Sequence, residues 1–444
     1  MTAARKREIH LNLNILNVGV YGSAWRWPSV DPAAFVDPAH YIRCAQIAEK
    51  GKLDAVFMAD KPGLVDHPQY RPFQALDPLV VLSGIAATTS HIGLIGTASS
   101  SYNSPYNIAR RFASLDLLSG GRAAWNIVTS AEIEIARNFG RSDVTAHADR
   151  YAIAREFVEI VRALWDSWED EALIADKAQG LLLDISKIHP IDHQSKNFSV
   201  AGPLTLPRSP QGRPVLVQAG ASDDGRNLAA GVAEVIFTLS QTLEKSIDFA
   251  ADIRRRAASF GRVPEDVVIL PGLCTVIGDT EAAAQARRRE LEELVPAEYG
   301  LARLAGTLQV DPDLLKLDEH LPEDLPIPVN HNQTMFAGTV AIARRENLTV
   351  RQLIRRLGGG AGHRIVAGTP EQIADDIGTW FAAGAADGFN IMPDVLPEGA
   401  ETFVTEVVPI LQRRGLFRTE YEGSTLRDHL GLTRAERGRF STAI

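Results

Sequence analysis

With 444 residues, of which 45% are hydrophobic and 23% charged, the chain can bury a large core and is not predicted to be disordered. Its net charge of -9 argues against a nucleic-acid partner, because no excess of cations is available to neutralise phosphates. The two cysteines, Cys44 and Cys274, predict no disulfide framework and favour a reducing cytoplasm. No apolar segment approaches the roughly 20 residues that span a bilayer, so we expect no membrane partner.

The N-terminal segment superficially resembles a secretory signal, because basic residues precede an apolar run. Asn12, Asn14 and Asn17 interrupt that run, so we interpret it as a first strand. Apolar segments of strand length then alternate with helical patterns, which is typical of βα units around a parallel sheet. We expect eight strands, at Ile9 to Leu16, Asp54 to Ala59, Ile92 to Thr97, Ala123 to Val128, Val215 to Ala219, Val235 to Leu239, Val267 to Val276 and Gly388 to Met392.

Helical patterns fill the intervals between these strands. The count of strands favours a closed TIM (β/α)8 barrel over an open doubly wound sheet, so the predicted fold class is α/β. The length allows two or three domains, but a barrel with insertions can pass 400 residues, and we expect residues 1–444 to form one domain. The expected helices lie at about Ala39 to Lys50, Pro78 to Thr89, Tyr106 to Leu118, Asp149 to Trp168, Gly225 to Gly231, Leu243 to Phe260 and Pro370 to Ala383.

Two segments are too long for simple loops. Residues 170–213 carry several prolines and are expected to form an excursion at the barrel mouth. Residues 281–366 are helical at first and then proline-rich, and we expect this insertion to define the substrate. The arginine-rich tail after Gly415 is expected to pack on a neighbouring subunit or on the barrel exterior.

The segment Leu117 to Ser130, LLSGGRAAWNIVTS, joins the end of a helix to a buried strand. Asn126 is unusual within that strand, since a ligand site in a parallel sheet needs hydrogen-bonding groups at the strand's carboxyl end. The alternative is an asparagine satisfied by loop backbone. Asp60, Thr97 and Ser222 likewise follow or end predicted strands, so all four residues would converge on one barrel face.

Two further features could hold a ligand. His147 and Tyr151 are spaced i, i+4 and would share one side of the first turn of a helix. The turn Gly220-Ala221-Ser222 brings small residues to a helix start, where backbone N–H groups can bind a phosphate. Alternatively, Ser222 is simply the helix N-cap. The run Gly358 to Gly362 lacks the spacing of a nucleotide-binding loop and suggests a lid hinge.

Several kinds of chemistry are disfavoured. The sequence has no HExxH or paired CxxC, so no metal site is expected, and no GxSxG elbow of a hydrolase. Lys61 is the only lysine at a predicted strand end that a Schiff-base aldolase could use. A barrel that binds a phosphorylated ligand but has few strong acids or bases suits a cofactor that carries the chemistry itself.

Several motifs resemble the nitrilotriacetate and dibenzothiophene-sulfone monooxygenase group of the bacterial luciferase superfamily. They are SGGRAAWNIVTS with the following ARNFG, HADRY at 147–151, GPL with PRSPQGRPVLVQAGAS, AADGFNIMPDVLP, and the C-terminal VVPILQRRGLFRTEYEGSTLRDHLGL. The resemblance covers about residues 8–432. It implies a TIM barrel that receives reduced FMN from a separate NAD(P)H:flavin reductase, reacts it with O2, and inserts one oxygen atom into a small organic substrate such as an aminopolycarboxylate, sulfone or thioether.

The resemblance also implies the flavin contacts. They fall on Asp60, Thr97, His147, Tyr151 and Ser222, with Asn126 as a further candidate and the phosphate at Gly220, Ala221 and Ser222. No catalytic residue beyond the flavin is predicted. Many members carry a histidine before the AWR motif, where this chain has Tyr21-Gly22-Ser23, so the resemblance does not transfer a substrate.

Two alternative functions stay open at this stage: a deazaflavin-dependent oxidoreductase on the same barrel, and a flavin-binding protein without turnover. No strand-to-helix turn has the GxGxxG fingerprint of a dinucleotide site. We therefore predict that the chain cannot oxidise NADH by itself. We also expect a homo-oligomer, either a dimer or a tetramer.

Overall fold

Eight parallel strands close into a barrel in the described part of the computed structural model, which comprises residues 7–64, 67–220, 222–326, 333–359 and 362–438. Each strand pairs with its sequential neighbour, and β13 pairs with β1 to close the ring. The predicted TIM barrel is therefore confirmed. The barrel strands are β1 (His10–Asn14), β2 (Ala55–Met58), β3 (Gly93–Ser99), β4 (Ala123–Val128), β9 (Val215–Gln218), β10 (Val235–Thr238), β11 (Val268–Ile277) and β13 (Gly388–Pro393).

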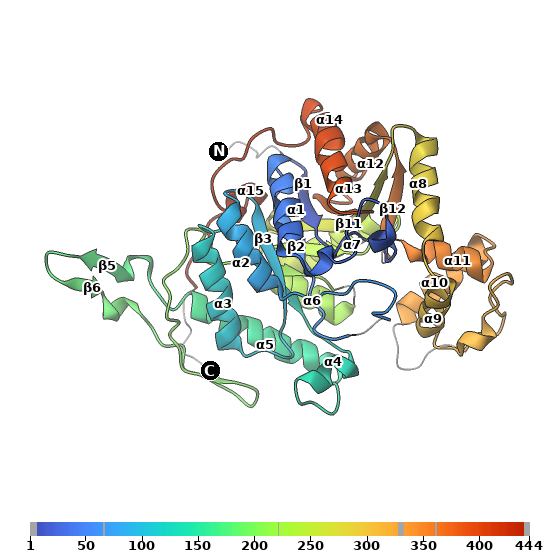
Figure 1. The fold of residues 1–444 in the computed structure, drawn as a ribbon. Helices are drawn as coiled ribbons and strands as arrows, with labels where there is room; N and C mark the ends of the chain where they lie inside the picture. The colour runs from blue at the N-terminus through green and yellow to red at the C-terminus, as the bar shows by residue number, and fades with distance from the viewer. Residues whose placement is uncertain (1–6, 65–66, 221, 327–332, 360–361, 439–444) are drawn as a thin grey trace.

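Helices cover the outside of the barrel (Figure 1). Proline at the first turn and a capping side chain start several of them; Asp37, Asp77 and Ser104 accept backbone N–H bonds at such starts. The helices next to the strands are α1 (Pro38–Lys50), α2 (Pro78–Thr88), α3 (Pro105–Leu118), α4 (Ile133–Asn138), α5 (His147–Trp165), α6 (Asp223–Val232), α7 (Leu243–Ser259), α12 (Pro370–Ala382), α13 (Glu398–Thr402) and α14 (Val408–Arg413).

The segment 170–213 spans the barrel lengthwise. Near its end, Gln211 donates to the carbonyl of Ala123, the first residue of β4, so this part lies at the N-terminal end of the strands. Its second hairpin, β7 (His193–Gln194) with β8 (Ser199–Val200), reaches the loop after β3. The first hairpin, β5 (Leu173–Asp176) with β6 (Leu181–Leu183), projects away from the body (Figure 1). Only part of the segment therefore approaches the predicted position at the mouth.

The segment 281–366 forms a helical unit opposite the projecting hairpin (Figure 1). Its helices enclose a small apolar core of their own, which includes Leu304, Leu308 and Leu353. The sequence did not predict the strand β12 (Arg364–Gly368), which begins inside this range and pairs with β11. The helices are α8 (Glu281–Glu293), α9 (Ala297–Leu308), α10 (Gln333–Arg345) and α11 (Val350–Gly358).

The C-terminal tail closes the N-terminal end of the barrel. Leu426 and Leu430 on α15 (Leu426–Leu430) share an apolar cluster with Ala55, Val235 and Val268, the first residues of three barrel strands. The tail therefore packs on the barrel of its own chain, at the N-terminal end, where its leucines cover the bottom of the core, and contact with a neighbouring subunit stays a prediction. No helix in the described ranges is long and apolar enough to cross a membrane.

Candidate functional site

The carboxyl ends of the strands form a mouth with polar walls. Side chains alternate between the two faces of a barrel strand. In β1, Leu11 and Leu13 pack outward against the helices, so Asn12 and Asn14 face inward. Asn12 donates to Asn390 on β13 at 3.1 Å, which confirms that these asparagines lie inside the barrel. An interior lined with amides can bind a polar ligand. The amides nearest the mouth need such a ligand to complete their hydrogen bonds.

Thr97 on β3 and Asn126 on β4 are direct partners across the sheet. Asn126 Nδ2 donates to Thr97 Oγ1 at 2.9 Å, and both side chains are buried. The alternative in which loop backbone satisfies the asparagine is wrong for its amide nitrogen. Its Oδ1 has no hydrogen-bond partner within the described ranges. Buried polar atoms are rarely left unpaired, so this oxygen is free to accept from a ligand.

Asp60 lies two residues beyond the end of β2. Burial raises the pKa of its carboxyl to about 6, and the nearby charge of Asp77 adds to the increase. In the described part of the chain, no hydrogen bond joins its side chain to Thr97 or to His147. The structure therefore places Asp60 at the predicted strand end as a carboxyl group that can carry its proton at mildly acidic pH.

The N-termini of α5 and α6 meet at another side of the mouth. His147 begins α5, and its ring centroid lies 4.9 Å from that of Tyr151, as their spacing predicts. His147 Nδ1 lies 3.1 Å from Asp224 Oδ2 in the first turn of α6. Two helix N-termini side by side favour negative charge through their dipoles and free N–H groups.

The turn before α6 is confined to small residues. A Cβ on Gly220 would lie 2.6 Å from Gln218 Nε2 and 2.9 Å from Gly225 Cα. Ser222 is the N-cap of α6, because its side chain accepts from Gly225 N at 3.1 Å. The capping interpretation is therefore confirmed, and it leaves the hydroxyl proton available for an anion. Ala221 lies outside the described residues.

An aromatic group forms the floor of the mouth. The rings of Phe57 and Phe237 lie 5.4 Å apart, and His363 stacks on Phe237 at 5.0 Å with an interplanar angle of 18°. His363 sits directly over Gly272 of β11, where a Cβ would come within 2.2 Å of its Nδ1. Burial lowers the pKa of His363 to about 4, so the ring is neutral at physiological pH. Its Nδ1 has no protein partner in the described structure.

Sequence reasoning missed two residues of the mouth, Asn14 and His363. Asn14 could have been predicted from the sequence, because polar residues at alternate positions of an otherwise apolar first strand indicate the side of the strand that faces a site. His363 had none, because it precedes the unpredicted β12. Gly359 packs against the ring of Tyr21, where a Cβ would come within 2.4 Å of the ring. The proposed hinge Gly358–Gly362 cannot be traced through, since Gly360 and Ala361 lie outside the described residues.

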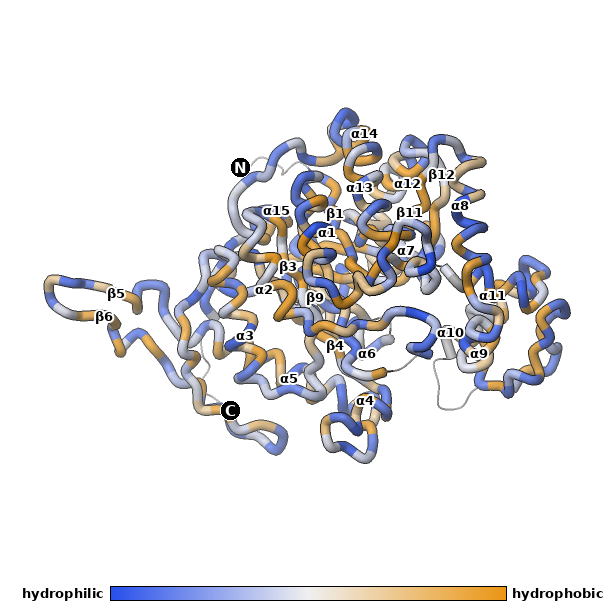
Figure 2. The backbone as a smooth tube through the Cα atoms, in the orientation of Figure 1, coloured by the Kyte–Doolittle hydropathy of each residue, from blue (hydrophilic) through white to orange (hydrophobic). Residues whose placement is uncertain are grey.

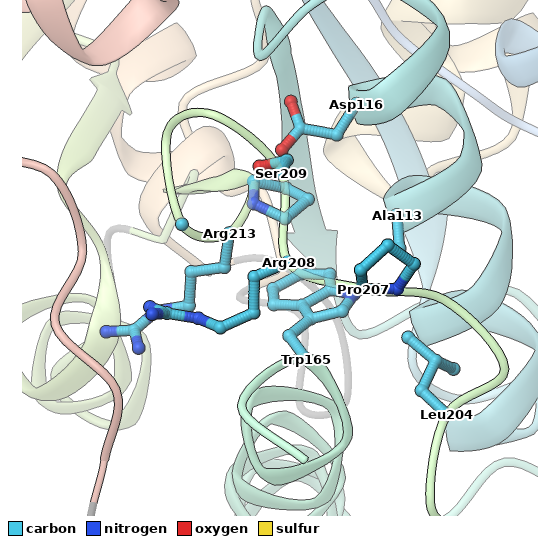
Figure 3. Close-up of a pocket in the computed structure, with 10 residues that line it drawn as sticks. Ala113, Asp116, Trp165, Leu204, Pro207, Arg208, Ser209 and Arg213 are labelled. Atoms are coloured by element: carbon cyan, nitrogen blue, oxygen red, sulfur yellow. The ribbon is translucent and has the colours of Figure 1, made fainter. Parts of the chain in front are cut away.

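Another cavity lies at the opposite end of the barrel (Figure 3). It is lined by Asp116, Trp165 and Arg208, among others, and its volume of about 10 Å³ holds no more than one water molecule. Asp116 accepts from the backbone N–H of Ala123, which starts β4. This cavity is therefore far from the strand ends where the polar groups converge, and it is no substrate site.

Comparison with known proteins identifies the family. The model of the luciferase-like monooxygenases matches residues 18–387, most of the chain. The chain belongs to the luciferase-like monooxygenase family. It is 47% identical to nitrilotriacetate monooxygenase component A of Aminobacter aminovorans over 96% of this chain and 97% of that protein.

Solved structures agree with this membership of the luciferase-like monooxygenases. EDTA monooxygenase from Chelativorans sp. BNC1 superposes with a TM-score of 0.80 at 38% identity, over 97% of this chain and 100% of that one. Riboflavin lyase, solved with modified FMN and riboflavin, has a TM-score of 0.83 at 32% identity over 96% of each chain. As a luciferase-like monooxygenase, this chain is an oxidoreductase, and active sites of TIM barrels lie at the carboxyl ends of the strands.

The mouth of this luciferase-like monooxygenase fits a flavin. The unpartnered atoms Asn14 Oδ1, Asn126 Oδ1 and His363 Nδ1 can pair with a ring that has several donors and acceptors along its edge. The paired N-termini of α5 and α6 suit a phosphate. The Phe57 and Phe237 rings supply an apolar surface for a planar ring system.

Proposed function

We propose that this protein is the oxygenating component of a two-component system that uses reduced FMN and O2 to oxygenate a small organic substrate. The observation that carries the proposal is the closed luciferase-like barrel, whose parallel strands end at one face, where we infer that Asp60, Thr97 and Asn126 share the mouth with the helix start at Ser222. Reduced FMN bound there would supply the two electrons with which one atom of O2 enters the substrate and the other leaves as water.

The residues have distinct proposed roles. Asp60, Thr97 and Asn126 bind the hydrogen-bonding edge of the flavin ring. The flavin phosphate is held where the N-termini of α5 and α6 meet. His147, Tyr151 and the turn of Gly220, Ala221 and Ser222 bind it there.

The aromatic floor excludes water. Phe57 and Phe237 present carbon surfaces beneath the reacting centre, and the neutral ring of His363 adds a third wall without a charge that would attract solvent. Exclusion of water matters because it strengthens every polar contact inside the site and suppresses hydrolytic side reactions.

The substrate class is proposed from chemistry and from the relatives. Relatives named for nitrilotriacetate and EDTA support an aminopolycarboxylate, and the neutral ring of His363 can donate to a carboxylate in the tautomer that carries its proton on Nδ1. A sulfone or a thioether is the other choice to be screened. The assay supplies photoreduced FMN and O2 to the purified chain with each candidate, and an oxygenated product identifies the substrate.

A separate NAD(P)H:flavin reductase is proposed as the source of reduced flavin, because no GxGxxG turn offers a seat for a dinucleotide. The purified chain with NADH, FMN and O2 should therefore consume negligible NADH. Photoreduced FMN should yield product with no second protein. Steady NADH oxidation by the chain alone, at rates comparable to product formation, would contradict the two-component system.

Residues 1–444 are proposed to form one domain, since β1 and β13 from opposite ends of the sequence pair directly. A homodimer or homotetramer is also proposed. The hairpin β5–β6 and the turn after it carry exposed aliphatic side chains that a second copy would cover (Figures 1 and 2). Sedimentation velocity of the wild-type chain and of the Leu182→Lys variant measures the oligomeric state and whether the hairpin contributes to it. The aliphatic residues are Leu173, Ile174, Leu181, Leu182 and Ile185.

A further inference from the structure

An arginine on the mouth side of the barrel has no counter-ion. Arg71 is half-buried in the loop of residues 59–77, which follows β2 and contains Asp60. Loops that follow barrel strands lie at the carboxyl ends of those strands, so Arg71 is on the same face as the proposed flavin site. Within the described ranges, which omit residues 65–66 of this loop, Arg71 forms no ion pair and has hydrogen bonds to neutral oxygen atoms alone.

Those hydrogen bonds are long. Arg71 Nε donates to the carbonyl of Pro72 and Nη1 to the hydroxyl of Tyr299, both at 3.4 Å. Such a distance exceeds the usual range of about 2.7–3.2 Å for an N–H donor and an oxygen acceptor. Nη2 has no hydrogen-bond partner in the described part of the chain. The guanidinium therefore has donors available for a ligand.

Two arginines of the adjoining helix α8 differ from Arg71 in this respect. Arg287 lies 2.7 Å from Glu398, and Arg288 lies 2.8 Å from Glu292. A charge removed from water is costly unless an opposite charge accompanies it. A carboxylate that belongs to a ligand would supply the counter-ion that Arg71 lacks.

The loop after β1 fixes the backbone on both sides of Arg71. Trp25 Nε1 donates to the carbonyl of Tyr70 at 3.0 Å, and Asn17 Nδ2 donates to the carbonyl of Pro72 at 3.5 Å. A binding group that is already held in place loses less conformational entropy when the ligand arrives. The arginine is therefore positioned before a ligand binds.

The helical unit 281–366 supplies a second polar group at the same point. Tyr299 on α9 is buried, and its hydroxyl accepts from Arg71. Among the described residues that hydroxyl has no acceptor for its own proton, so it can donate to a ligand. A Cβ on Gly22 would lie 3.7 Å from Tyr299 Oη and 4.0 Å from Arg71 Cβ. The loop after β1 thus passes beside both groups at a residue that has no side chain to cover them.

From these contacts we infer that Arg71, together with the hydroxyl of Tyr299, binds a carboxylate of the substrate and selects organic anions over neutral molecules. The inference rests on the proposed function and deepens it, because it chooses the carboxylates among the substrate classes to be screened. A guanidinium can bind a carboxylate through two parallel hydrogen bonds, and the tyrosine can donate a third. A neutral sulfone or thioether has no charge to pair with Arg71.

Calorimetric titration of the full chain with reduced FMN, in metal-free buffer without O2, tests the inference with two probes of one skeleton. Nitrilotriacetate carries the carboxylates, and nitrilotriacetamide is its neutral triamide. We expect nitrilotriacetate to bind saturably and the triamide to bind at least about tenfold more weakly.

Three variants assign the difference to Arg71. Arg71→Gln removes the cation and should weaken nitrilotriacetate binding about tenfold or more. Arg71→Lys keeps the charge but not the planar fork, so its loss should be smaller, and it serves alone if Arg71→Gln does not fold. Arg26→Gln is the matched control and should bind like the wild type. Arg26 is an exposed cation of the loop after β1 that donates to the carbonyl of Leu294 in the helical unit 281–366.

FMN affinity and thermal unfolding separate this inference from the proposed function. Both should be equal in Arg71→Gln and the wild type. If FMN does not bind to the wild type, the proposed function fails, and the same titrations on the chain without flavin still judge Arg71.

Four results would overturn the inference. They are a failure of nitrilotriacetate to bind the wild type saturably, equal affinity for the triamide, wild-type affinity in the Arg71 variants, and an equal loss in Arg26→Gln. A matching loss of FMN affinity in Arg71→Gln would also overturn it, because Arg71 would then be a flavin-binding residue.

Discussion

The two ends of the barrel handle polar groups in opposite ways. At the N-terminal end, Asp54 is fully buried and accepts from Leu11 N at 2.7 Å while it pairs with His10 and Arg418. At the C-terminal end, Asn14 and Asn126 are also buried, but their side-chain oxygens have no hydrogen-bond partner among the residues that the structure describes.

The difference shows that polar groups stabilise the fold at one end of the barrel and are available for ligand binding at the other. Arg427 binds Glu234 through two hydrogen bonds, of 2.8 and 3.0 Å, and the leucines of α15 cover the core beside them. Asp54 and Glu234 at that end each pair with an arginine from the distant C-terminal tail. The mouth instead holds its polar atoms ready for a ligand, which is the usual division of a TIM barrel into a stability face and a functional face.

The largest expected effect is at the closed end. Asp54→Ala should lower the free energy of unfolding by about 3–5 kcal/mol, because Arg418 would remain buried without its partner. Urea denaturation measures it. Asn14→Ala at the mouth is the matched control and should cost less than about 1 kcal/mol, since its oxygen has no partner to lose. Equal losses of unfolding free energy in the two variants would contradict the distinction between a stabilising end and a ligand-binding end of the barrel.

A smaller effect is expected at the phosphate seat. Ser222→Ala should weaken FMN binding by about 1.5–3 kcal/mol through loss of a hydrogen bond to a charged group. Thr280→Ala is the control, because Thr280 caps α8 with a bond of the same length, 3.1 Å, to Ala283 N. Both should lose about 1 kcal/mol of stability as helix caps. Unchanged FMN affinity in Ser222→Ala would restrict Ser222 to capping.

The smallest effect concerns pH. Because burial raises the pKa of Asp60 to about 6, the native state prefers its protonated form. Its contribution to stability is complete below the unfolded pKa of about 3.8 and is lost as the pH rises through 6. Asp60→Asn should remove this dependence and be more stable than the wild type at pH 7.5 by about 1–2 kcal/mol, allowing for partial solvent screening.

Thermal unfolding across pH 4 to 8 measures the difference between Asp60→Asn and the wild type. The exposed variant Asp143→Asn should follow the wild-type curve. If Asp60→Asn keeps the same slope between pH 4 and 7, the carboxyl at the mouth is solvated, and the contrast with the closed end does not extend to Asp60.

The amino-acid sequence determined the barrel. All eight predicted strands are present, because a strand buried on both faces is a nearly continuous apolar run that can be recognised locally. The short strand β12 was missed, since four of its five residues are only partly buried and its position depends on pairing with β11. Thr97 and Asn126 could be brought together from sequence because adjacent parallel strands end at the same edge.

Only the tertiary structure decided the contacts between distant segments. Arg418 pairs with Asp54 across 364 positions, and no local pattern in the tail indicates that it closes the barrel. His363 reaches the mouth only because Gly272 leaves room for its ring. Likewise, Arg141 and Lys196 are ordinary surface cations in the sequence, and they enclose a cavity with Arg150 only because the hairpin folds back along α5. Periodicity fixes secondary structure, whereas these contacts depend on how the elements pack.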